Sequence, residues 1–188
     1  MQRPSMSRAI VGAAAMLLVG AVHANLVTNG GFETGNLTGW SLTGNTSFIG
    51  VQCPGPSSAV QSGNCSGFFG PVGSLGGIAQ TLATVAGATY DISFWLSSDG
   101  GIPSQFVFNW DGGAPELSLS NMPASGFVQE TFHLAASSTN TSLSFSFRDD
   151  PGFIYLDTVS VTQVPEPGTL ALAVLALGGL AATRRRKQ

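Results

Sequence analysis

The sequence predicts an all-β protein, a jelly-roll β-sandwich with a short apolar segment at each end of the chain. Three observations carry this prediction. Between residues 25 and 164, apolar and polar residues alternate in several short segments, as they do in half-buried strands. Turn clusters rich in Gly, Pro and Asp separate these segments, and no stretch of useful length has the period of a helix. Many short strands with this spacing are typical of sandwiches and jelly rolls.

The N-terminal segment, residues 1–24, is predicted to be a signal peptide. Arg3 and Arg8 supply the positive start, followed by an apolar core up to Val22 and a small-residue cleavage site that ends at Ala24. The alternative is a retained membrane anchor, but the apolar run is short against the roughly 20 residues that a membrane span needs. We therefore expect export and cleavage after Ala24.

Residues 25–164 form the predicted sandwich domain, and its length suits one hydrophobic core. Weaker strands are expected at 47–52 and 77–83. Later segments alternate clearly, and the apolar residues that share a face in each are Tyr90, Ile92, Phe94 and Leu96; Phe106, Phe108 and Trp110; Val128, Phe132 and Leu134; Leu143, Phe145 and Phe147; and Ile154 and Leu156. Val159 and Val161 have the opposite parity to the last pair, which predicts a bulge near Asp157.

Two cysteines lie in a Gly/Pro/Ser-rich loop of this domain. Cys53 and Cys65 are 12 positions apart, and in an exported protein they are expected to form a disulfide. The alternative is a pair of metal ligands. Zinc would need two further N or S ligands, and His133 is the only histidine of the predicted domain.

Charge is scarce and unevenly distributed. Only 9% of the 188 residues are charged, against about a quarter in an average domain. Between residues 25 and 164, Arg148 is the only Lys or Arg against nine Asp and Glu residues, a net charge of about −8. Because phosphate binding needs clustered cations, the domain is predicted not to bind nucleic acid.

The C-terminal segment, residues 165–188, has the order of a sorting signal. A Pro165, Glu166, Pro167 motif precedes an apolar stretch at 170–182, and the basic cluster that follows is Arg184, Arg185, Arg186 and Lys187. As a helix the apolar stretch would be about 20 Å long, which is short for a bilayer core of about 30 Å. The basic cluster would stop transfer and stay in the cytoplasm. The alternative is a plain C-terminal membrane anchor.

This order of motif, short membrane helix and basic end resembles the PEP-CTERM sorting signal. In that family exosortase, a membrane protease, recognises the Pro-Glu-Pro motif and releases or transfers the protein. The resemblance implies exosortase as a partner and a transient anchor in the inner membrane. It also implies a final place at the cell surface or in the extracellular matrix of a Gram-negative bacterium that makes exopolysaccharide.

The middle of the chain resembles galactose-binding-like jelly rolls, a superfamily that includes carbohydrate-binding modules. Residues 25–33 (NLVTNGGFE) and 39–40 (GW) are similar to the opening of these domains, and residues 153–161 (FIYLDTVSV) to their last strand. Residues 69–72 and 94–96 are similar to single-domain PEP-CTERM proteins of the same superfamily. The resemblance implies the fold and gives little information about the ligand.

In these modules the first and last strands lie together and often hold a structural calcium ion. The resemblance implies Glu33 and Asp157 as its carboxylate ligands, with backbone carbonyls of residues 29–31 contributing further oxygens. Thr158 stands where a second acid is usual, which removes one ligand. The alternative is that both carboxylates are only solvated or hydrogen-bonded at strand ends.

No catalytic residue is predicted. His133 has neither a nucleophile nor an orienting acid at a suggestive spacing. Asp149 and Asp150 are adjacent, so in a strand they would point to opposite faces and would not flank one glycosidic bond. These two residues are expected to start the turn that follows them.

Aromatic residues are the better candidates for function, because sugars stack on Trp and Tyr rings. We expect Trp95, Trp110 and Tyr155 to form a glycan platform, and Trp95 has the parity of the polar residues of its strand. The alternative is that these rings fill the core. The favoured function is a non-catalytic surface or matrix protein that associates with exopolysaccharide and binds glycan weakly. A structural matrix protein without a small ligand and a secreted hydrolase are the alternatives.

Overall fold

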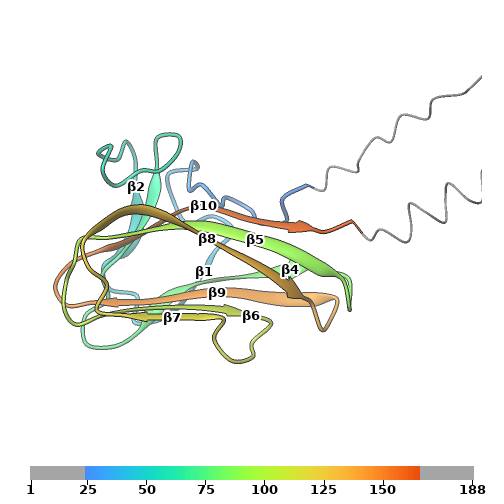
Figure 1. Cartoon of the computed structure of the whole chain (residues 1–188). Coiled ribbons are helices and arrows are strands. Elements are labelled where there is room, and N and C mark those ends of the chain that lie inside the picture. The colour runs from blue at the N-terminus through green and yellow to red at the C-terminus, as the bar shows by residue number, and fades with distance from the viewer. Residues whose placement is uncertain (1–23, 166–188) are drawn as a thin grey trace, which may run out of the picture.

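The computed structural model describes residues 24–165, which contain ten strands and no helix (Figure 1). The strands are β1 (Ser41–Gly44), β2 (Ile49–Gln52), β3 (Ser66–Phe69), β4 (Gly76–Ala83), β5 (Thr89–Ser98), β6 (Ser104–Trp110), β7 (Leu117–Ser120), β8 (Ser125–Ala135), β9 (Asn140–Asp149) and β10 (Ile154–Gln163). The all-β prediction is confirmed. Within 24–165 no helix is long and apolar enough to cross a membrane. Residues 1–23 of the predicted signal peptide, Glu166, Pro167, the apolar tail and the basic cluster at 184–187 lie outside the described residues.

The strands form two five-stranded sheets that face each other (Figure 1). The strand order is β1-β4-β9-β6-β7 in one sheet and β2-β3-β10-β5-β8 in the other, and all the pairings are antiparallel. Chain neighbours such as β9 and β10 lie in opposite sheets, so the chain crosses repeatedly between the layers, as it does in jelly rolls. The predicted jelly-roll sandwich is confirmed.

Aromatic side chains fill the space between the sheets. The ring of Phe94 on β5 is fully buried, and its centroid lies 5.0 Å from that of Phe145 and 5.2 Å from that of Phe108, both on the facing sheet. The residues that alternation assigned to the inner faces of β5, β6 and β9 are all buried, which confirms those three patterns. Val128 departs from its pattern and is 52% exposed, because β8 is an edge strand.

β10 contains the predicted bulge. Its register with β5 shifts between Asp157 and Ser160, and Thr158 has a φ of 49°. The bulge turns Val159 to the inner face, where it is buried. The N–H of Val159 donates to the carbonyl oxygen of Gly30 at 2.9 Å, and a Cβ at Gly30 would lie 2.1 Å from the carbonyl oxygen of Val159. Only glycine allows the opening segment to approach β10 so closely.

Three short strands were not predicted from the sequence. β1 and β3 have four residues each; all of β1 is exposed and three residues of β3 are buried, so neither shows alternation. β7 does alternate, but over four residues only and at the edge of its sheet. The weaker predicted strands at 47–52 and 77–83 are confirmed as β2 and β4.

Candidate functional site

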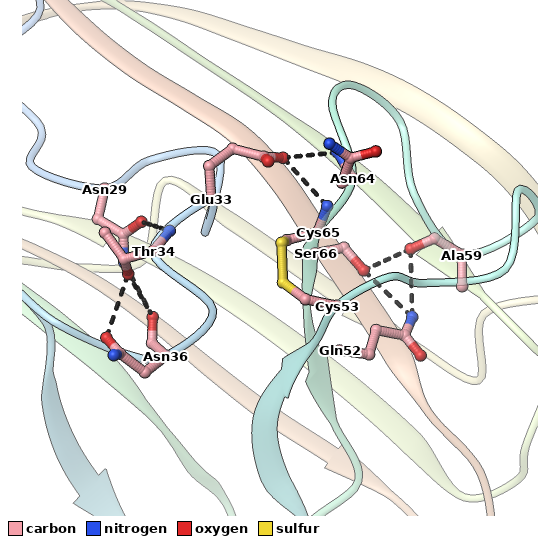
Figure 2. The surroundings of a disulfide bond; sticks show 10 residues. All are labelled: Asn29, Glu33, Thr34, Asn36, Gln52, Cys53, Ala59, Asn64, Cys65 and Ser66. Atoms are coloured by element: carbon pink, nitrogen blue, oxygen red, sulfur yellow. Dashed lines mark hydrogen bonds between the residues drawn. A yellow bond between two sulfur atoms is a disulfide. The ribbon is translucent and has the colours of Figure 1, made fainter.

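A disulfide closes the loop that joins β2 to β3. Cys53 and Cys65 are bonded, with their Cα atoms 4.6 Å apart, which confirms the predicted pairing. The loop rises above the sheet that contains β10 (Figure 1). The hydroxyl of Ser66 and the side-chain amide of Gln52 both donate to the carbonyl oxygen of Ala59 (Figure 2). These bonds give the disulfide loop (residues 53–65) a fixed shape beside the sheet.

Glu33 fastens the disulfide loop to the opening segment of the domain. Its Oε1 atom accepts hydrogen bonds from the N–H groups of Asn64 and Cys65, at 2.9 and 3.0 Å (Figure 2). Gly63 makes this approach possible, because a Cβ there would lie 2.2 Å from the same oxygen, and its φ of 70° also favours glycine. The carboxylate of Glu33 therefore accepts hydrogen bonds from two backbone amides of the loop.

Asp157 fastens the same loop to β10. The side chain is fully buried, and Oδ2 accepts hydrogen bonds from the N–H groups of Gln61 and Ser62, at 2.9 and 3.1 Å. Oδ1 accepts from the N–H of Thr158 at 2.6 Å and from its hydroxyl at 3.3 Å. Burial raises the pKa of Asp157, while the hydrogen bonds donated by these groups act in the opposite direction.

These contacts bear on the calcium ion that the sequence leads us to expect at Glu33 and Asp157. Each oxygen of Asp157 already accepts two hydrogen bonds, so a cation there would have to displace donors. Oε1 of Glu33 is occupied in the same way. Within 24–165, no three His, Cys, Asp or Glu side chains are placed to hold a metal ion. Calcium at this pair stays a prediction.

A cleft of about 460 Å³ lies between the disulfide loop and the start of β8. Loop residues form one wall, the ends of β5 and the residues around the start of β8 form the rest, and β10 contributes an aromatic ring. The lining residues are Pro56, Ser58, Ala59, Ser97, Ser98, Asp99, Ala124, Ser125, Gly126 and Tyr155. Hydroxyls, one carboxylate and one phenol ring make a surface suited to a polar ligand with an apolar face.

Tyr155 is the aromatic group of this cleft. Ile154 and Leu156 point into the core, so Tyr155 occupies an outward position on β10, where it is half-buried. Burial and the negative charges of Asp99 and Asp149 raise the pKa of its phenol. The hydroxyl therefore stays protonated at neutral pH and can donate a hydrogen bond to a ligand.

The two tryptophans predicted as part of the platform behave differently. Trp110 is only 3% exposed, its ring lies 5.9 Å from that of Tyr90, and its Nε1–H donates to the carbonyl oxygen of Ala135. The prediction of Trp110 as a glycan platform is therefore wrong. Trp95 is half-buried and does not line the cleft, although it occupies an outward position next to Leu96 on β5.

Asp149, which the sequence analysis assigned only to the start of a turn, is a candidate site residue. It is fully buried at the end of β9, and neither carboxylate oxygen has a hydrogen-bond partner. Burial, and then the charges of Asp99 and Asp150, raise the pKa of Asp149 to about 6. The signal was present in the sequence, because Asp149 shares the parity of Phe145 and Phe147 and so belongs to the inner face.

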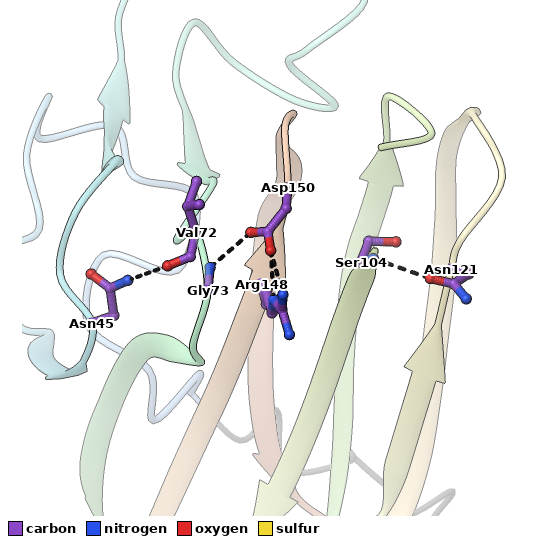
Figure 3. Close-up of polar contacts among 7 residues, drawn as sticks. All are labelled: Asn45, Val72, Gly73, Ser104, Asn121, Arg148 and Asp150. Atoms are coloured by element: carbon purple, nitrogen blue, oxygen red, sulfur yellow. Dashed lines mark hydrogen bonds and ion pairs between the residues drawn. The ribbon is translucent and has the colours of Figure 1, made fainter. Parts of the chain in front are cut away.

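Asp150, by contrast, is fully paired in the turn after β9. Its Oδ2 accepts from the guanidinium group of Arg148 and its Oδ1 accepts from the N–H of Gly73 at 3.0 Å (Figure 3). The hydrogen bond from Arg148 holds the pKa of Asp150 below its usual value. Of the two adjacent carboxylates, Asp149 thus accepts no hydrogen bond, whereas both oxygens of Asp150 accept at least one.

His133 also has a partner that the sequence did not predict. Its Nδ1 atom contacts a carboxylate oxygen of Asp91, which lies directly across from it on β5. Both side chains are more than half exposed, at 78% and 52%. Spacing in the sequence could not reveal this contact, because pairing between strands brings together residues that are distant in the sequence.

Comparison with known proteins identifies the C-terminal segment. Residues 163–187 match the model of the PEP-CTERM protein-sorting motif. The segment is a PEP-CTERM sorting signal, as predicted. The motif implies export, transit through the membrane and processing by exosortase. No curated protein matches the chain in sequence.

The described domain has the fold of carbohydrate-binding modules. It is similar to a family 61 module solved in complex with β-1,4-galactotriose, at 18% identity and a TM-score of 0.63 over 75% of this chain and 99% of that one. It is also similar to the CBM22-1 xylan-binding domain of Xyn10C from Paenibacillus barcinonensis, at 17% identity and a TM-score of 0.53 over 79% and 99%. These similarities confirm the predicted fold.

Proposed function

We propose that the protein is an exported, non-catalytic component of the cell surface or extracellular matrix that exosortase processes and that associates with exopolysaccharide. The sorting signal at 163–187 supports export and processing. The module-like fold supports a role in glycan binding, because the similar structures include a module in complex with galactotriose and a xylan-binding domain. Calcium at Glu33 and Asp157 stays a prediction from the sequence, and this function does not require it.

The cleft between the disulfide loop and β8 is the observation that carries the binding function. Tyr155 offers an aromatic ring, and the exposed serines at 58 and 125 offer hydroxyls beside it. Asp99 adds a negative charge, and the domain has a single Arg or Lys. An anionic polymer would be repelled unless calcium bridged it to the domain, so we propose a neutral glycan as the ligand. One stacking ring supports affinities in the range of about 1 µM to 1 mM.

Tyr155 variants test this function. A glycan array, followed by titration calorimetry with the host polysaccharide, identifies the ligand of the exported protein. Tyr155→Ala should weaken binding by about tenfold or more, which corresponds to about 1.4 kcal/mol, whereas Tyr155→Phe should keep most of it. Phe48→Ala removes a 62% exposed ring outside the cleft and serves as the matched control.

Two other results would change the proposal. Loss of binding in Trp95→Ala, with Tyr155→Ala unaffected, would move the platform away from the cleft to the tryptophan that the sequence favoured. Absence of binding to every glycan, with or without calcium, would favour the alternative of a structural matrix protein without a small ligand.

A hydrolase is the remaining alternative, because Asp99 lines the cleft and lies near a second carboxylate with a raised pKa, Asp149. The burial of Asp149 argues against it, since a general acid must reach the leaving oxygen of the substrate and this side chain has no exposed surface. New reducing ends after incubation with the bound polysaccharide would contradict the non-catalytic function.

A further inference from the structure

Two carboxylates and a carbonyl oxygen meet where the loop after β5 approaches the turn after β9. A Cβ placed on Gly152 would lie 2.4 and 2.8 Å from the two carboxylate oxygens of Asp99 and 2.9 Å from Oδ1 of Asp149. A Cβ placed on Gly101 would lie 1.9 Å from the same Oδ1 and 2.5 Å from the carbonyl oxygen of Pro151. The oxygens of three residues therefore converge beside two residues that have no side chain.

These oxygens lack a positive partner in the described part of the chain. The oxygens of Asp99 accept one hydrogen bond each, from the N–H groups of Gly101 and Phe153, which leaves further lone pairs. The oxygens of Asp149 are buried and accept none. The one Lys or Arg among residues 24–165, Arg148, is bonded to Asp150 (Figure 3).

A buried carboxylate without donors is strongly unfavourable unless it is protonated or bound to a metal ion. We propose that this corner binds one calcium ion through the carboxylates of Asp99 and Asp149 and the carbonyl oxygen of Pro151. Water molecules complete the shell. Asp99 is exposed, so the ion enters from the solvent side.

The donor set selects calcium. All the converging atoms are oxygens, which suit hard cations and not zinc, a metal bound mostly by N and S atoms in proteins. Calcium accepts carboxylates and backbone carbonyls in irregular arrangements, whereas magnesium demands a near-octahedral shell and keeps its waters. With two carboxylates only, the expected Kd is that of weak extracellular sites, about 10⁻⁴ to 10⁻³ M.

This corner differs from the pair that the family resemblance implies. At Glu33 and Asp157, backbone amides donate to the oxygens that would hold a cation. At Asp149 no donor reaches either oxygen. The proposal does not rest on glycan binding, since its test measures the ion alone.

Calcium titration of the exported protein, freed of metal with EDTA, tests the site. Calorimetry should show one calcium ion bound, with magnesium at least tenfold weaker. A free calcium concentration of about ten times Kd multiplies the folded-to-unfolded ratio by about 11, which raises the unfolding midpoint by about 5 °C for a domain of this size. Asp149→Asn and Asp99→Asn should each abolish the heat of binding and the shift of the midpoint.

Control variants separate this site from the other acids. Asp111→Asn, at a remote loop where the carboxylate accepts the N–H of Ser137, should leave calcium binding unchanged. Calcium binding that survives in Asp149→Asn and Asp99→Asn but disappears in Asp157→Asn would overturn the proposal and place the ion at the pair with Glu33. Absence of binding to the wild type at 10 mM calcium would overturn it as well.

Discussion

Removal of the disulfide by the double substitution Cys53→Ser, Cys65→Ser should destabilise the domain without abolishing its fold. The bridge closes a loop between residues 12 apart, and in the chain-entropy model a closure of this length is worth about 3 kcal/mol. The fold should survive because Glu33 and Asp157 each hold two amide groups of the same loop. At about 2.1 cal/mol/K per residue, the midpoint of thermal unfolding should fall by about 10 °C.

Urea unfolding followed by tryptophan fluorescence measures this loss. The unfolding midpoint of the variant should fall with little change in slope, and reduction of the wild type with dithiothreitol should reproduce the effect. Equal free energies of unfolding for variant and wild type, within about 0.5 kcal/mol, would refute the reasoning. The carboxylate anchors would then be sufficient to order the loop.

The same variant should weaken glycan binding. Pro56, Ser58 and Ala59 of the disulfide loop form one wall of the cleft, so greater motion of the loop adds an ordering cost to binding. The loss should be smaller than that caused by Tyr155→Ala, because the ring that stacks on the ligand is still present.

Three further predictions concern processing, the core and pH. The mature protein from its native host should lack the residues beyond about Pro167, and an intact mass that still includes the 184–187 cluster would contradict this. Phe145→Ala should cost about 3–5 kcal/mol in urea unfolding, because Phe145 is fully buried and contacts several aromatic rings, whereas Phe48→Ala should cost less than about 0.5 kcal/mol. In calcium-free buffer, the stability of the wild type relative to Asp149→Asn should fall as pH rises from about 4 to 7. The pKa of Asp149 is about 6 in the folded protein, against 3.8 for an ordinary aspartate, so over this range the folded protein keeps a proton that the unfolded chain has lost. Parallel stability curves for the two proteins would contradict this assignment.

Alternation predicted the parts of the fold in which one face of a strand is buried along its whole length. β5, β6 and β9 follow the pattern completely, and even the parity switch in β10 identified the bulge. β1 could not be found in this way, because it is an edge strand with four exposed residues. Its pairing with β4 is a property of the assembled sheet that leaves no hydrophobic pattern in the sequence.

The candidate site was only partly predictable for a related reason. Trp110 shares the parity of Phe106 and Phe108, so strict use of the alternation would have placed it in the core, where the structure has it. Tyr155 has the outward parity of β10, and the structure places it in the cleft. The cleft itself depends on the path of the disulfide loop over the sheet, which the spacing of the cysteines does not specify.

The shortage of basic residues links the loop, the cleft and the proposed calcium site. A domain with nine acids and one base must pair most of its carboxylates with something other than side-chain cations. Glu33 and Asp157 accept hydrogen bonds from backbone amides of the disulfide loop, and Asp150 accepts them from the single arginine. Asp149 is buried as completely as Asp157, but it accepts no hydrogen bond from an amide or from the arginine. A cation from solution is the partner that remains for it, and a calcium-rich exterior would supply that partner only after export, so the domain should gain stability once it has left the cell.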